Sequence, residues 1–137
     1  LPMPTEPNIL EILDWKVARV SFPCCKSLED RVMDYCCFEG SQAELPTQGY
    51  FLKTENPKFC LPDIVLVPGL AFDFQGYRLG QGHGYYDMYF DQHDCLSIGL
   101  CYSWQIFKKI DAKKHDKKMK MIITDHEIVK LEKCEFL

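Results

Sequence analysis

The chain contains no long apolar segment. Within its 137 residues, no apolar run approaches the roughly 20 residues that a helix needs to cross a bilayer. Residues 1–7 also contain neither the basic nor the apolar region of a signal peptide. The sequence therefore predicts a protein of the cytoplasm that does not enter a membrane.

The chain also has no excess of positive charge. Lys and Arg total 16 and Asp and Glu total 20, which gives a formal net charge of −4. Binding to nucleic acid or to an acidic membrane surface depends on excess positive charge, so neither partner is expected. The hydrophobic fraction of 47% is that of a globular protein, and the length suits one domain over residues 1–137, which we expect to be monomeric.

Metal-binding spacings of cysteine and histidine are absent, although the chain has eight cysteines. Zinc sites are usually announced by C-x₂₋₄-C or by closely spaced histidines. Here two cysteine pairs are vicinal, Cys24-Cys25 and Cys36-Cys37, and the others are scattered. In a chain without a signal peptide we expect free thiols that pack as small hydrophobic groups.

The first half of the sequence predicts a helix followed by strands. Apolar residues recur at helical spacing over residues 6–15, and a β-rich run over residues 17–22 ends before Pro23. Residues 31–38 alternate as a second strand does. Residues 39–61 are rich in turn-forming residues and are expected to be loop with at most one short element.

The second half alternates between strands and helices. Residues 63–68 form a continuous apolar run, which is typical of a strand buried on both faces. Two further strands are expected at residues 95–101 and 119–124, with helices opening at Tyr85 and covering residues 104–110. This alternation predicts an α/β fold of three layers, in which a mostly parallel central sheet is flanked by helices.

A glycine-rich segment directly precedes the helix expected at Tyr85. Gly80, Gly82 and Gly84 stand at alternate positions, where they allow several backbone N–H groups to converge on an anion, and the helix adds its positive dipole end. No Gly-Lys-Ser/Thr follows, so this is not a Walker A loop, and Tyr85 occupies the third glycine position of a dinucleotide fingerprint. An anion site is one interpretation, and a flexible turn is the other.

Two charged residues flank the glycines. The guanidinium of Arg78 has a geometry suited to phosphate, and Asp87 can hold Mg²⁺ against phosphate oxygens. Asp87 could instead simply stabilise the first turn of its helix. Together with the glycines, the pair favours a site for a metal-bound phosphate.

Two blocks of sequence carry a specific resemblance. Residues 67–73, Val-Pro-Gly-Leu-Ala-Phe-Asp, and residues 78–87, Arg-Leu-Gly-Gln-Gly-His-Gly-Tyr-Tyr-Asp, resemble the signature of the 5-formyltetrahydrofolate cyclo-ligase family, also called 5,10-methenyltetrahydrofolate synthetases. Weaker similarity extends to residues 1–4 with Glu6 and to His115-Asp116. The resemblance implies an enzyme that uses ATP and Mg²⁺ to convert 5-formyltetrahydrofolate, with or without a polyglutamate tail, to 5,10-methenyltetrahydrofolate, ADP and phosphate.

The implied reaction begins when the formyl oxygen attacks the γ-phosphoryl group of ATP. The folate N10 then closes the ring, and phosphate leaves. Phosphoryl transfer depends mainly on positioning and charge neutralisation, so the sequence does not need a covalent nucleophile.

The resemblance also assigns roles to individual residues. The implied ATP site consists of Arg78, Leu79, Gly80, Gln81, Gly82, His83, Gly84, Tyr85 and Tyr86. Arg78 and Tyr86 are the implied catalytic residues. Asp87 and Asp116 are the implied Mg²⁺ ligands, and Glu6, Tyr85 and Tyr86 are the implied folate contacts.

Each role has a structural alternative. Asp116 lies among lysines and could be a solvated surface charge, and one of the two tyrosines could belong to the core. Glu6 could act only as an acidic residue at a helix N-terminus. We expect His83 to contribute its backbone N–H and not its ring.

Two further features qualify the resemblance. The resemblance implies that family members usually begin with a basic helix that reaches the ATP phosphates, and we expect this chain to lack that helix. The alternative function is therefore a non-catalytic nucleotide- or folate-binding module. Seven lysines lie within residues 108–120, either as a solvated surface or as contacts for a polyglutamate tail.

Overall fold

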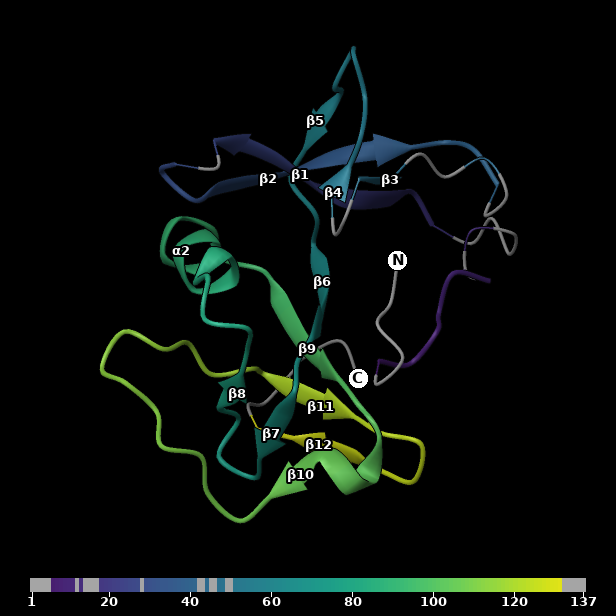
Figure 1. Ribbon diagram of the computed structural model, residues 1–137. Coiled ribbons are helices and arrows are strands. Elements are labelled where there is room, and N and C mark those ends of the chain that lie inside the picture. The colour runs from purple at the N-terminus through teal and green to yellow at the C-terminus, as the bar shows by residue number, and fades with distance from the viewer. Residues whose placement is uncertain are drawn as a thin grey trace.

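The computed structural model describes residues 6–11, 13, 18–27, 29–41, 44, 47, 48 and 51–131. These residues form twelve strands, β1 to β12, and one α-helix, α2 (Tyr85–Gln92), which lies beside β2 and β6 (Figure 1). No helix in this described part is long and apolar enough to cross a membrane.

A four-stranded sheet supports the centre of the molecule. Its order is β12-β11-β9-β6, with bounds β6 (Ile64–Pro68), β9 (Leu96–Leu100), β11 (Met121–Ile123) and β12 (Ile128–Lys130). Strands β6, β9 and β11 are parallel, and β12 returns antiparallel to β11. The three strands predicted from apolar runs in this part of the chain are thus confirmed.

Burial along β6 alternates, so the expectation that both of its faces are buried was wrong. Val65 and Val67 are buried, whereas Ile64 is 56% exposed. Leu66 lies on the other face and lines a cavity. The run of β6 is apolar because one face packs in the core and the other forms the wall of a cavity. The hydrophobic pattern of the sequence alone does not distinguish these two surroundings.

A second sheet is antiparallel and has the order β1-β2-β5, with bounds β1 (Val20–Ser27), β2 (Val32–Phe38) and β5 (Phe59–Cys60). Strand β1 continues through Pro23, where the sequence predicted its end, and Pro23 stands opposite Tyr35. Because β1 is at the edge of this sheet, the missing N–H of a proline is tolerated.

The remaining strands are very short. They are β3 (Thr47–Gln48), β4 (Phe51–Leu52), β7 (Ala71–Asp73), β8 (Arg78–Leu79) and β10 (Ile106–Phe107). Strands β10, β7 and β8 form a small sheet in that order, and β3 pairs with β4. The segment expected to be almost entirely loop, residues 39–61, therefore contains three short strands.

Two expected helices differ from the structure. Residues 103–105 form a 3₁₀ turn, η2 (Ser103–Gln105), and β10 follows, so the helix predicted over residues 104–110 is wrong. Pairing with β7 and burial of the Gln105 side chain favour this extended path over a helix. Near the start, residues 6–9 are not helical, residues 10–11 form a turn and Leu13 is helical, while residues 12 and 14–17 lie outside the described part.

The chain is therefore a mixed α/β protein. The predicted three-layer arrangement around a mostly parallel sheet is not confirmed, because the sheets are mixed and the described residues contain only one α-helix. The connection from β9 to β11 shows why. It runs through η2, β10 and an irregular segment, where a layered fold would have a covering helix.

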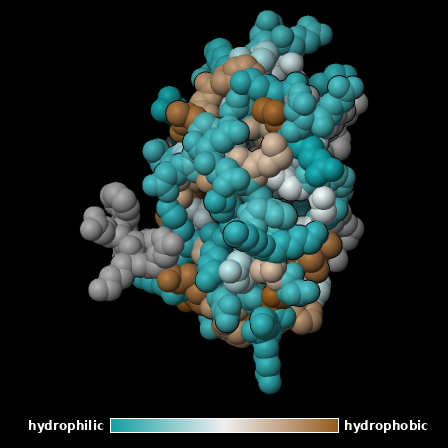
Figure 2. Space-filling model, turned by 90° about the vertical axis from the view of Figure 1, so that its left-hand side faces the viewer, coloured by the Kyte–Doolittle hydropathy of each residue, from teal (hydrophilic) through white to brown (hydrophobic). Residues whose placement is uncertain are grey.

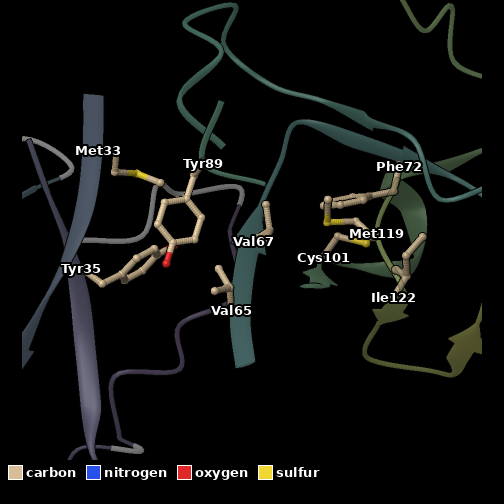
Figure 3. Packing of buried hydrophobic residues seen from close by; sticks show 9 residues of the cluster. All are labelled: Met33, Tyr35, Val65, Val67, Phe72, Tyr89, Cys101, Met119 and Ile122. Atoms are coloured by element: carbon tan, nitrogen blue, oxygen red, sulfur yellow. The ribbon is translucent and has the colours of Figure 1, made fainter. Parts of the chain in front are cut away.

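The main hydrophobic core holds α2 against both larger sheets (Figure 3). It consists of Met33, Tyr35, Val65, Val67, Phe72, Tyr89, Cys101, Met119 and Ile122. Tyr89 of α2 is 4% exposed, and its ring meets that of Tyr35 edge-on, with centroids 5.0 Å apart. This packing fixes the helix, and with it the glycine-rich segment at the helix N-terminus.

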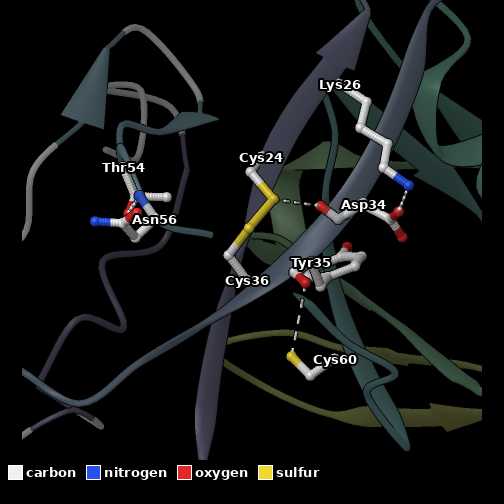
Figure 4. Close-up of a disulfide and its surroundings, with 8 residues drawn as sticks. All are labelled: Cys24, Lys26, Asp34, Tyr35, Cys36, Thr54, Asn56 and Cys60. Carbon is white, nitrogen blue, oxygen red and sulfur yellow. Dashed lines mark hydrogen bonds and ion pairs between the residues drawn. A yellow bond between two sulfur atoms is a disulfide. The ribbon is translucent and has the colours of Figure 1, made fainter. Parts of the chain in front are cut away.

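Two of the cysteines are bonded to each other, which corrects the expectation of free thiols. Cys24 of β1 and Cys36 of β2 form a disulfide with Cα atoms 6.2 Å apart (Figure 4). Cys24 stands opposite Asp34 in the ladder, so Cys36 lies diagonally across the strand pair, within disulfide reach. The other described cysteines are thiols, namely Cys25, Cys37, Cys60, Cys95 and Cys101, while Cys134 lies outside the described residues.

Candidate functional site

The residues singled out in the sequence line one cavity of about 580 Å³. Its lining includes Glu6, all of residues 78–87, and Asp116. The cavity also reaches Pro68 and Leu100, at the carboxyl ends of the parallel strands β6 and β9. Open α/β sheets bind ligands at this edge.

The glycine-rich segment has the backbone conformation expected of an anion cradle. Gly82 and Gly84 have φ values of 85° and 73°, in the left-handed region that favours glycine. Gly84 is the N-cap of α2 and offers no side-chain acceptor to the first amides of the helix. Those amides and the helix dipole favour an anion in the adjoining cavity.

Arg78 is held at the cavity wall by three contacts. Its Nη2 lies 3.8 Å from Oδ2 of Asp87, its Nη1 donates to the carbonyl of Pro68 at 3.3 Å, and its guanidinium lies 5.1 Å from the ring centre of Tyr86. A Cβ at Gly80 would lie 2.5 Å from Nη1 of Arg78. Glycine at position 80 therefore makes room for the guanidinium.

The two aspartates predicted to bind metal both line this cavity. Oδ1 of Asp87 accepts the N–H of Lys117 at 3.0 Å, and Oδ2 of Asp116 accepts the N–H of Lys113 at 2.7 Å. Among the described residues, no group of three or more His, Cys, Asp or Glu is placed to hold a metal ion. A pair of carboxylates nevertheless fits Mg²⁺, which is usually bound by one or two carboxylates together with substrate phosphates and water.

Tyr86 links the charged part of the cavity to Glu6. Burial raises the pKa of Tyr86 to about 12, Arg78 partly offsets this, and the negative charge of Glu6 adds to it. The phenol therefore stays protonated at neutral pH and can donate a hydrogen bond. Burial also raises the pKa of Tyr85, which packs edge-on against Phe51.

Comparison with known proteins decides the family. A family model described as the 5-formyltetrahydrofolate cyclo-ligase family matches residues 2–125. The chain belongs to this family.

Individual relatives agree with this assignment. A 5-formyltetrahydrofolate cyclo-ligase of Saccharomyces cerevisiae is 39% identical over an alignment of 92 residues, and the match covers 58% of this chain and 44% of the yeast protein. A probable 5-formyltetrahydrofolate cyclo-ligase of Caenorhabditis elegans is 34% identical over an alignment of 114 residues, and the match covers 72% of this chain and 53% of that protein. The chain thus spans about half the length of the curated relatives it matches.

A solved structure supports the fold. The 5,10-methenyltetrahydrofolate synthetase of Aquifex aeolicus superposes with a TM-score of 0.81 at 24% identity, covering 100% of this chain and 72% of that one. At this identity the likeness supports the cyclo-ligase fold and not the role of any residue.

In this cyclo-ligase family member, sequence reasoning missed the apolar wall of the cavity. That wall consists of Pro7, Ile9, Leu10, Phe22, Pro23, Met33 and Phe51. These residues come from four separated parts of the chain, and no motif connects them. Residues 1–4, which the resemblance placed at the folate pocket, lie outside the described residues.

Two buried polar side chains behind the cavity were also missed. Gln105 is 1% exposed, and its Nε2 donates to the carbonyls of Gly69 and Leu70 at 3.1 and 3.2 Å. Asp73 is 0% exposed and accepts backbone N–H groups from two segments. For Asp73, a sequence signal existed, because an aspartate that ends an apolar strand before a glycine turn commonly caps that turn.

Proposed function

We propose that this protein is a 5-formyltetrahydrofolate cyclo-ligase. It converts 5-formyltetrahydrofolate and ATP to 5,10-methenyltetrahydrofolate, ADP and phosphate, with Mg²⁺. Family membership supports the reaction class. That the enzyme acts as a monomer in the cytoplasm stays a prediction from the sequence.

One observation carries the proposal. A single cavity has a polar part, formed by the left-handed glycines, Arg78 and two aspartates, and an apolar wall that adjoins Glu6. A triphosphate suits the first part, because the backbone N–H groups and the guanidinium match its charge. A flat pterin ring with polar edges suits the second part, where Glu6 can accept hydrogen bonds from ring N–H groups.

The residues of the cavity suggest how the reaction proceeds. The glycine cradle and Arg78 hold the γ-phosphoryl group while the formyl oxygen attacks phosphorus and ADP leaves. N10 then attacks the formyl carbon and loses its proton, the ring closes, and the former formyl oxygen departs with the phosphate. The Tyr86 hydroxyl, protonated at neutral pH, is placed to hydrogen-bond the oxygen that gains negative charge.

Asp87 and Asp116 are the residues that would hold Mg²⁺. When bound, the ion would neutralise charge on the phosphate oxygens during transfer. Nη2 of Arg78 lies 3.8 Å from Oδ2 of Asp87. This long ion pair leaves the guanidinium close enough to the cradle to contact a phosphate.

A direct assay tests the proposal. The purified chain is mixed with ATP, Mg²⁺ and 5-formyltetrahydrofolate, and formation of the methenyl chromophore is followed by absorbance. Turnover that stops when ATP or Mg²⁺ is omitted supports the function. Binding of ATP and the folate without turnover would instead favour the non-catalytic module.

The same cavity supports a finer proposal about the folate tail. Lys113 lines the cavity and is exposed, while Lys117 and Lys120 of the same run pair with Asp91 and Asp94. Figure 2 shows that the face carrying α2 and this run is mainly hydrophilic. We propose that a polyglutamate tail leaves the cavity along this face and passes Lys113.

A further inference from the structure

The segment between β10 and β11 contributes much of the cavity without regular structure of its own. Residues 110–119 form only one turn, yet Ile110, Asp111, Lys113, His115 and Asp116 all line the cavity. The segment runs as an irregular loop past β8 and below α2 (Figure 1). Its position therefore has to come from contacts with the rest of the protein.

Three backbone N–H groups of this segment are anchored. That of Ile110 donates to Oδ2 of Asp73 at 2.9 Å, and that of Met119 donates to the carbonyl of Gly76 at 2.8 Å. Between them, the N–H of Lys117 donates to Asp87. Both ends of the segment are thus tied to the turn over residues 73–77, and its middle is tied to α2.

Asp73 is central to this arrangement. While Oδ2 holds Ile110, Oδ1 accepts the N–H groups of Gln75 and Tyr77 at 2.9 and 3.0 Å. The side chain is fully buried. All the groups that bond to this side chain are donors, so both Oδ1 and Oδ2 must be acceptors. A carboxylate has two acceptor oxygens, whereas an amide has only one.

The turn that Asp73 organises leads directly into Arg78. Tyr77 is held by Oδ1 and precedes Arg78, which contacts Asp87. The other oxygen holds the segment that carries Asp116. One carboxylate thus connects the arginine side of the phosphate site to the side formed by residues 110–116.

We propose that Asp73 is a positioning residue of the cyclo-ligase site, which fixes Lys113 and Asp116 at a set distance from Arg78 and Asp87. This inference rests on the proposed function for its role in catalysis. Asp73 does not line the cavity and so acts only through the groups it holds.

The variant Asp73→Asn tests the proposal with little change in volume. Its amide oxygen can still accept the N–H groups of Gln75 and Tyr77, whereas its amide nitrogen would face the N–H of Ile110. Loss of one buried hydrogen bond, with two donors left facing each other, should raise the KM and Kd for Mg·ATP about tenfold. The Kd for 5-formyltetrahydrofolate should change less than about twofold, because the apolar wall is untouched.

Amide hydrogen exchange supplies a readout that does not depend on activity. In Asp73→Asn, exchange across residues 108–116 should be faster, while exchange in β9 and α2 should match the wild type. Asp94→Asn is the matched control, because Asp94 is an exposed carboxylate that bonds Lys120 outside the cavity. It should leave both exchange and the Kd for Mg·ATP unchanged.

A second variant tests the same hydrogen bond in case Asp73→Asn does not fold. Ile110→Pro removes the same hydrogen bond from the donor side and should produce the same defect in Mg·ATP binding. The double variant should be no worse than either single one, because both remove one interaction. Additive defects, or unchanged exchange in Asp73→Asn, would overturn the positioning role. Absence of turnover in the wild type would overturn only the proposed function, since exchange still tests Asp73.

Discussion

Oδ1 of Asp87 accepts the backbone N–H of Lys117 at 3.0 Å, and this bond joins the first turn of α2 to the residue that follows Asp116. The hydrogen bond from the backbone of Lys117 to the Asp87 side chain thus helps to bring the two candidate metal ligands, Asp87 and Asp116, to one cavity. The carboxylate of Asp87 also pairs with Arg78, and binding of Mg²⁺ is the third role that we propose for it.

Substitutions of Asp87 should separate these tasks. Asp87→Asn retains an oxygen for the Lys117 N–H but loses the negative charge, so we expect a folded protein whose Mg²⁺-dependent turnover falls by at least about a hundredfold. Asp87→Ala should lose turnover and also show a lower melting temperature. Normal turnover of the Asn variant at saturating Mg·ATP would show that Asp87 is not a metal ligand.

The glycine cradle can be tested at Gly82. Apart from its chain neighbours, a Cβ there meets no atom of the described residues within 4 Å, so a larger residue is opposed by the φ of 85° and by any ligand in the cradle. Gly82→Val should lower stability by about 1–2 kcal/mol and weaken ATP binding. Gly82→Asn is the control for backbone strain, because asparagine tolerates this conformation. If calorimetry finds the same ATP affinity for Gly82→Val and the wild type, the glycine-rich segment is only a turn and not an anion site.

Buried tyrosines predict how stability responds to alkali. Burial raises the pKa of Tyr89 to about 12, and that of Tyr35 also rises well above its usual value. The folded state therefore favours the neutral phenols, and their contribution to stability is complete below about pH 10 and is lost as the pH rises towards 12.

Urea unfolding between pH 8 and 11.5, values chosen to bracket the usual tyrosine pKa of about 10, measures this effect. Over this pH range, the free energy of unfolding should fall less in Tyr89→Phe than in the wild type, by at most about 2–3 kcal/mol. Tyr102→Phe, outside the core cluster, should leave the slope as it is. A slope identical in all three proteins would contradict the assignment of the decline to Tyr89.

The lysine run predicts a salt-dependent preference for longer folates. At low ionic strength, a polyglutamylated substrate should bind about two- to fivefold more tightly than the monoglutamate, because exposed charges attract weakly and additively. Salt should reduce the difference. Lys113→Ala should shrink it, whereas Lys108→Ala, an exposed lysine that does not line the cavity, should have a smaller effect. Equal affinities for the polyglutamylated and monoglutamylated folates at low salt would show that the lysine run is only a solvated surface.

What the sequence could and could not predict follows from how local each feature is. The strands around Val65 and Ile98 and the helix at Tyr85 were predictable, since each depends on a continuous pattern. The residues from Arg78 to Asp87 meet in one cavity partly because they are neighbours in the chain. Asp116 and Glu6 required the family resemblance to be placed there.

The contacts that assemble the site lay beyond pattern reasoning. Asp73 and Ile110 are 37 residues apart, and Gln105 and Gly69 are 36 apart. In both contacts one partner is a backbone group, which every residue has, so the sequence contains no complementary pair to find. The disulfide was missed for a different reason, because the two-residue offset of Cys24 and Cys36 becomes visible only when the strand register is known.

The way in which residues 110–119 are anchored has a consequence for how this part of the protein can vary among its relatives. Its three anchors use main-chain N–H groups of Ile110, Lys117 and Met119, so most side chains in between are free to be exchanged without loosening it. The number of residues between the anchors is not free, because an insertion or deletion would move Asp116 relative to Asp87. Proline is also excluded at the three anchoring positions, since it has no N–H to donate. Selection here should therefore act on spacing, on the absence of proline at the anchors and on the proposed ligand contacts Lys113 and Asp116, and it should leave the other side chains to drift.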